Sequence, residues 1–172
     1  MNKKMPNQDA YNADQQMGIK SEANTLAVLK KCLGEHIRKS KKEYAVLDFY
    51  STRYKLKAEV KGRRNKHLHY DTTMIGENKI LEAERLQESG YETIFFFDFT
   101  DKLCYFKFSD FEKLRSHKKM GGTWRRGLRE WKLYRYINVN DLTEYDVCSM
   151  LPIDYIKTKR KIQKKQKEKK SV

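Results

Sequence analysis

Residues 54–62 read Tyr-Lys-Leu-Lys-Ala-Glu-Val-Lys-Gly, and a charged residue occupies every second position from Lys55 to Lys61. Apolar residues fill the positions between them. This period of two predicts a strand over residues 54–61 with one buried face. It also places Glu59 and Lys61 on the same face, two residues apart, so their side chains can converge on one point.

A second acidic residue lies in the segment just upstream. Residues 44–50 (Tyr-Ala-Val-Leu-Asp-Phe-Tyr) are nearly all apolar and predict a buried strand, which Asp48 interrupts. An ionised carboxylate there costs several kcal/mol unless a partner or a cation compensates it. The structural alternative is that Asp48 ends the strand and meets water before a turn at residues 51–53. If the two strands pair, Asp48 and Glu59 offer hard oxygen ligands for a divalent cation, the chemistry that metal-dependent phosphodiester hydrolysis needs.

Hydrophobic periodicity and glycine stops predict the remaining elements. In chain order these are a helix over 14–33, a strand over 68–75, a helix over 76–89, a central strand over 92–99, a strand over 103–108, a helix or loop over 109–120, a strand over 131–137 and a short terminal element over 139–151. Glu22 lies near the edge of the apolar stripe of the first helix, where its carboxylate can point toward a cleft.

Asp48, Glu59 and Lys61 resemble the D…(E/D)-x-K signature of the PD-(D/E)XK nuclease superfamily, which includes restriction endonucleases and Holliday-junction resolvases. The resemblance covers residues 14–108, and more loosely the chain to about 150. It implies an α/β fold, with a restriction-endonuclease-like core of αβββαβ order and a mixed central sheet flanked by helices. The segment after the core resembles the hairpin of phage and large-virus relatives, so a C-terminal β-hairpin extension is expected.

The resemblance also implies a chemistry for these residues. Asp48 and Glu59 would hold Mg²⁺ or Mn²⁺ together with the backbone carbonyl of Val60, and Lys61 would position the attacking water. Glu22 would supply the extra carboxylate that many members place against the metal.

The pattern Tyr70-x-Thr72-Thr73-x-Ile75-(x)3-Lys79 resembles the phage and large-virus branch, in which the threonine and the lysine line the cleft. Lys79 is therefore a further catalytic candidate. Its alternative is an ordinary solvated lysine in the first turn of a helix, where its charge opposes the helix dipole.

The net charge of +15 favours a polyanionic partner, with DNA the partner expected here. Candidates for contact with nucleic acid follow the strand that carries Glu59, lie on the next strand, or belong to a basic segment near Trp124: Arg63, Arg64, Lys66, Thr73, Arg125 and Arg126. Trp124 among arginines is typical of a stacking platform for single strands, or of a hairpin tip packed on the core. His67 and His69 are interpreted as phosphate-contacting or exposed rather than metal-binding, since no third ligand follows at suitable spacing.

The 172 residues suit one domain with tails. The predicted organisation is a flexible arm over 1–13, the nuclease core over 14–108, an extension packed on it over 109–156 and a disordered lysine-rich tail over 157–172. Three dispersed cysteines indicate neither disulfides nor a zinc site. No membrane span or secretory signal is recognised, so we expect a cytoplasmic protein, nuclear in a eukaryotic host, or a virion component, and a homodimer stays open.

Three hypotheses follow. The first is a Mg²⁺-dependent nuclease, a hydrolase of phosphodiester bonds in DNA. The second is a catalytically inactive nuclease fold that binds nucleic acid or packages a genome. The third is a basic structural protein of a virion whose tail neutralises nucleic acid. The intact Asp48, Glu59 and Lys61 set favours the first.

Overall fold

The computed structural model describes residues 8–41, 45–121 and 131–145. Its helices and strands form a mixed α/β fold. In chain order they are α1 (Gln8–Leu33), β1 (Arg38–Lys39), β2 (Phe49–Ser51), β3 (Leu56–Gly62), β4 (Thr72–Gly76), α2 (Glu77–Glu88), β5 (Glu92–Asp98), β6 (Leu103–Lys107), β7 (Ser116–Gly121), β8 (Lys132–Asn138) and β9 (Thr143–Glu144). Single turns of 3₁₀ helix separate some of them.

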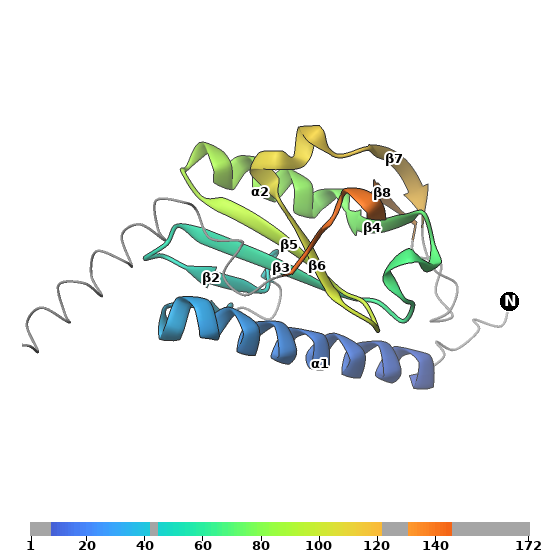
Figure 1. Cartoon of the computed structure of the whole chain (residues 1–172), viewed down its shortest axis with the longest axis horizontal. Coiled ribbons are helices and arrows are strands. Elements are labelled where there is room, and N and C mark those ends of the chain that lie inside the picture. Colours follow the sequence, from blue (N-terminus) through green and yellow to red (C-terminus); the bar gives the residue numbers. More distant parts are fainter. Residues whose placement is uncertain (1–7, 42–44, 122–130, 146–172) are drawn as a thin grey trace, which may run out of the picture.

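Two sheets organise these elements. The larger sheet has the order β1-β2-β3-β5-β6-β9, and the smaller has the order β4-β8-β7. Among the described strands of the large sheet, only β3 and β5 pair in parallel and the other pairs are antiparallel, so the predicted mixed central sheet is confirmed. The long helix α1 covers one face of the large sheet, and α2 and the small sheet lie on the other side (Figure 1).

The contact between α1 and β3 is unusually close at Gly62. A Cβ atom at that position would lie 2.6 Å from Ser21 Oγ, so glycine allows the helix and the end of the strand to approach. Farther along the helix, Leu29 and Leu33 pack on the apolar face of β3, where Ala58 is fully buried. This packing brings Glu22, next to Ser21, toward the end of β3.

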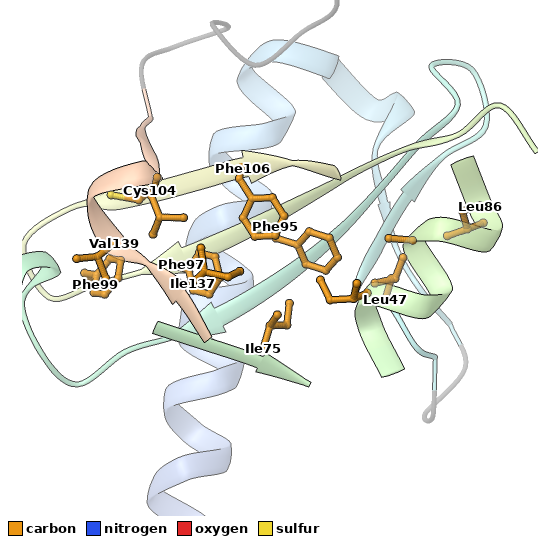
Figure 2. Packing of buried hydrophobic residues seen from close by; sticks show 13 residues of the cluster. Leu47, Ile75, Leu86, Phe95, Phe97, Phe99, Cys104, Phe106, Ile137 and Val139 are labelled. Carbon is orange, nitrogen blue, oxygen red and sulfur yellow. The ribbon is translucent and has the colours of Figure 1, made fainter. Parts of the chain in front are cut away.

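The opposite face of the large sheet carries an aromatic core. Phe95, Phe97 and Phe106 lie against each other there, with Phe95 and Phe106 stacked at 4.8 Å between ring centroids (Figure 2). Both faces of β5 are buried, which explains its nearly continuous apolar sequence. Ile75 of β4 and Ile137 of β8 join this core and hold the small sheet on it.

Several predicted boundaries need correction. Helix α1 begins at Gln8 instead of 14, so part of the expected arm is helical. The strand predicted over 44–50 is β2, which starts only at Phe49, and Asp48 precedes it. A 3₁₀ turn occupies His67–His69, so the strand predicted from 68 starts at Thr72.

Two corrections concern pairing. The predicted third strand of the core, β4, belongs to the small sheet and pairs with β8 rather than with the central sheet. The segment predicted as helix or loop over 109–120 forms a 3₁₀ helix at Phe108–Lys113 and then strand β7. Strands β7 and β8 pair antiparallel, which confirms the expected C-terminal hairpin.

Candidate active site

Strand β3 directs Glu59 toward α2, opposite the apolar side chains that pack on α1. The Glu59 side chain is only 1% exposed. Its Oε1 lies 2.6 Å from the Lys61 ammonium, and its Oε2 accepts a hydrogen bond of 3.1 Å from Lys79. A buried carboxylate needs such compensation. Lys61, two residues along β3, and Lys79, in the first turn of α2, therefore both contact the Glu59 carboxylate.

Asp48 completes this site from the loop before β2. Its Oδ2 accepts a 2.7 Å hydrogen bond from the backbone N–H of Val60. Burial and, next, the charge of the nearby Glu59 carboxylate together raise the pKa of Asp48 to about 6, against the opposing effects of the Val60 N–H and the Lys61 charge. Two mutually repelling carboxylates thus share one site, an arrangement typical of functional centres.

We expect Asp48→Asn to stabilise the metal-free protein at pH 7. A carboxyl group whose pKa is raised on folding contributes stability that is fully present below its pKa in the unfolded chain. This contribution is lost as the pH rises through the pKa in the folded protein, here about 6. The variant should therefore be about 1–3 kcal/mol more stable than wild type at pH 7 and equally stable near pH 4. Urea titrations in EDTA measure this. An equal loss of stability at both pH values would contradict it.

Glu22 and Lys79 occupy the flanks of the site. Glu22 Oε2 lies 2.7 Å from the ammonium of Lys39, and the Glu22 charge contributes to the raised pKa of Asp48. Lys79 also donates to the backbone carbonyl of Val46. Lys79 is therefore not a solvated lysine: it ties α2 to Glu59 and to the loop that carries Asp48.

The carboxylate oxygens of the site are hard donors, which suit a divalent cation such as Mg²⁺. In the described part of the chain no group of three or more His, Cys, Asp or Glu side chains is close enough to hold a metal ion. Yet Glu22 Oε2 and Glu59 Oε1 are buried oxygens that accept no hydrogen bond of acceptable geometry from the described residues. Each of these oxygens lies beside an ammonium group, that of Lys39 or of Lys61, so the carboxylates could hold a divalent cation in place of these lysines.

Among the candidates for nucleic-acid contact, some are engaged in hydrogen bonds within the protein and others are exposed. Arg63 Nε donates to Thr73 Oγ1 at 2.8 Å, and its guanidinium lies over the Phe97 ring, so both polar groups hold β4 against the loop after β3. Arg64 and Lys66 are exposed, although Arg64 also pairs with Asp14.

Other candidates differ from expectation or lie elsewhere. His67 is buried, not exposed: its Nε2 donates to the Val139 carbonyl at 2.9 Å, and its ring packs edge-on against Phe99. His69 is exposed. Trp124, Arg125 and Arg126 lie outside the described residues.

A buried ion cluster that the sequence did not suggest anchors the hairpin on α2. Glu77 opens α2 and receives two hydrogen bonds from Arg135 of β8, at 2.8 and 3.1 Å, and an ion pair of 2.8 Å from Lys118 of β7. Burial works to raise the pKa of Glu77, but these partners bring the pKa below its ordinary value. The sequence offered one local sign of this cluster, an acidic residue in the first turn of a helix. Both basic partners of Glu77 come from a hairpin that is distant in the sequence.

The mixed sheet, the buried acid–x–lysine pair on β3 and the second acid beside it are consistent with a core of the PD-(D/E)XK class. The chain belongs to the family described as "Phage putative PDDEXK endonuclease", which matches residues 12–158. Membership implies a hydrolase that acts on nucleic acid. No curated protein and no solved structure gives a significant match. None of the described helices is both long and apolar enough to cross a membrane.

Proposed function

We propose that this protein is a Mg²⁺-dependent nuclease that hydrolyses phosphodiester bonds in DNA. The observation that carries the proposal is the buried Glu59 carboxylate, which contacts the Lys61 and Lys79 ammonium groups and lies beside Asp48. A fold held together by apolar packing gains little from such a cluster, because burying charges costs free energy that their pairing seldom exceeds. Membership in an endonuclease family supports the same conclusion.

Asp48 and Glu59 would hold the cation, with the Val60 carbonyl as a further ligand and Mn²⁺ as an alternative ion. In the described residues Asp48 accepts a hydrogen bond through Oδ2 alone, which leaves Oδ1 for another partner. A cation in this place would also relieve the repulsion from Glu59 that, after burial, contributes to the raised pKa of Asp48. When bound, Mg²⁺ supplies Lewis-acid stabilisation of the phosphate and a more acidic water.

The two lysines would have different tasks. The Lys61 side chain is 34% exposed, so its ammonium can reach from Glu59 to a water or a phosphate oxygen in the cleft. The Lys79 side chain is 17% exposed and holds the Val46 carbonyl as well as Glu59. Lys61 would orient the attacking water or neutralise developing charge, whereas Lys79 would position Glu59. Glu22 would act as an additional carboxylate at the edge of the site.

Arg64 and Lys66 would contact the DNA backbone. Both are exposed in the loop that follows β3, the strand carrying Glu59 and Lys61. Phosphate contacts from such a loop would orient the DNA without reading its sequence.

A cleavage assay tests the proposal. Supercoiled, linear and branched DNA are incubated with the full chain in Mg²⁺, Mn²⁺ or EDTA, and a Glu59→Gln preparation purified in parallel detects contaminating nuclease. We expect nicking or cleavage with either metal, none in EDTA, and recovery when Mg²⁺ is restored. Tight DNA binding with no cleavage under any condition would instead identify an inactive nuclease fold that binds nucleic acid.

A further inference from the structure

Strand β1 brings a further lysine to the edge of the candidate active site. Lys39 pairs in register with Phe49 of β2, and the next residue, Ser40, donates its backbone N–H to the Asp48 carbonyl at 2.8 Å. The Ser40 hydroxyl also donates to the Leu47 carbonyl at 2.8 Å. The backbone of β1 is therefore tied to the loop that carries Asp48, and Lys39 projects from a fixed place in the sheet, one residue before that tie.

The ammonium of Lys39 neutralises Glu22 of α1. It lies 2.7 Å from Glu22 Oε2, and the Glu22 side chain is 24% exposed. Among the described residues, Lys39 alone forms an ion pair with Glu22. Glu59 differs in this respect, because the ammonium groups of both Lys61 and Lys79 contact its carboxylate. Glu59 would therefore keep one lysine if a metal ion displaced the other, whereas Glu22 would lose its basic partner.

The acids of the site divide into a pair and a single carboxylate. Within the described ranges, Glu22, Asp48 and Glu59 do not form one group of three that is close enough to share a metal ion. The affinity of a site for a divalent cation rises with the number of charged ligands. An ion between Asp48 and Glu59 gains two carboxylates when it displaces Lys61. A second ion at Glu22 would gain one carboxylate and would have to displace Lys39 from it.

We propose that Lys39 serves as a built-in cation for Glu22, so that the site binds one divalent ion per chain instead of two. An ammonium 2.7 Å from the carboxylate repels any divalent ion that approaches the same oxygen. Lys39 is thus a positioning residue that acts through Glu22, and it does not have to contact the DNA. The inference rests on the proposed function, because it concerns the same metal site.

Manganese titrations without DNA test the proposal independently of cleavage. Mn²⁺ is added to the full chain, and the free ion is measured by electron paramagnetic resonance. The variant Glu59→Gln supplies the background of unspecific binding. We expect wild type to bind one Mn²⁺ per chain and Lys39→Met to bind a second. Removing a positive charge that lies about 4–6 Å from a divalent ion should tighten the second site about 10-fold or more.

Three further variants isolate the charge of Lys39. Lys39→Arg keeps the charge and should bind one Mn²⁺. Lys39→Met combined with Glu22→Gln removes the acid as well and should also bind one. Lys30→Met removes a different lysine of α1, which pairs with Glu35 at 2.9 Å, and should not change the number of bound ions. Urea midpoints establish that each variant is folded.

Two Mn²⁺ ions bound to wild type would overturn the proposal, as would a single ion bound to folded Lys39→Met. A second ion gained equally by Lys30→Met would also overturn it, because net charge alone would then explain the change. Failure of the proposed function gives a different result. Wild type would then bind no Mn²⁺ above the Glu59→Gln background, which would overturn the metal-dependent nuclease together with the role of Lys39.

Discussion

Glu59→Gln is expected to reduce metal-dependent DNA cleavage by at least about 10³-fold, because a cation contributes several kcal/mol to stabilising the transition state and each 1.4 kcal/mol is tenfold in rate. Glutamine preserves the shape of a side chain that is 1% exposed. It removes the charge that Lys61 and Lys79 compensate and that a cation would require. Initial rates on supercoiled DNA at saturating Mg²⁺ measure the effect.

The matched control is Glu77→Gln. Glu77 is also a buried carboxylate with two basic partners, Arg135 and Lys118, but it anchors the hairpin and lies outside the Asp48 and Glu59 pair. Breaking either cluster leaves cations without their acid, so both variants should lose stability, by about 1–3 kcal/mol. Only Glu59→Gln should lose cleavage. Equal loss of activity in both folded variants would show that Glu59 has no special part in the reaction.

The alternation in residues 54–61 was enough to predict where Glu59 and Lys61 meet. A strand alternates its side chains whatever packs around it, so two charged residues at this spacing share a face. Asp48 was harder to place: the pairing of β2 with β3 holds, but Asp48 reaches Val60 from just before the strand. Lys79 was a candidate because the pattern around it resembles the phage and large-virus branch, and in the structure its ammonium contacts the Glu59 carboxylate.

Long-range pairing was not predictable in the same way. Strand β4 pairs with β8, and β7 pairs with the other edge of β8. The sequence of β7, Ser-His-Lys-Lys-Met-Gly, has no apolar alternation because its outer face is exposed and its inward lysine meets Glu77. Without an apolar face, a strand is defined by its partner rather than by its own residues.

The burial of His67 could not be predicted for the same reason. His67 carries no local sign of being internal, since it follows a basic loop. Its environment consists of Phe99 and the Val139 carbonyl, both distant in the sequence. A satisfied buried imidazole and an exposed phosphate ligand look alike until the tertiary contacts are known.

Lys61→Ala is expected to lower the rate of cleavage by about 10²–10³-fold, the effect of removing one positioned proton-transfer or charge-stabilising group. DNA affinity in EDTA should stay within about twofold, because one phosphate contact among many contributes little to binding at moderate salt. The Lys61 ammonium is partly exposed and 2.6 Å from Glu59, so it can act in the cleft without supporting the core. Single-turnover rates separate this loss from weaker binding.

Two other lysines near Glu59 serve as controls for the Lys61→Ala variant. Lys57 lies on the same face of β3, two residues on the other side of Glu59, and its ammonium lies over the Tyr50 ring instead of the carboxylate. Lys57→Ala removes the same charge from the same strand and should leave cleavage near the wild-type rate. Lys79→Ala breaks contacts to Glu59 and to the Val46 carbonyl, so it should lower the urea midpoint as well as the rate. If Lys57→Ala and Lys61→Ala lose activity equally, strand charge alone matters, and Lys61 has no specific catalytic role.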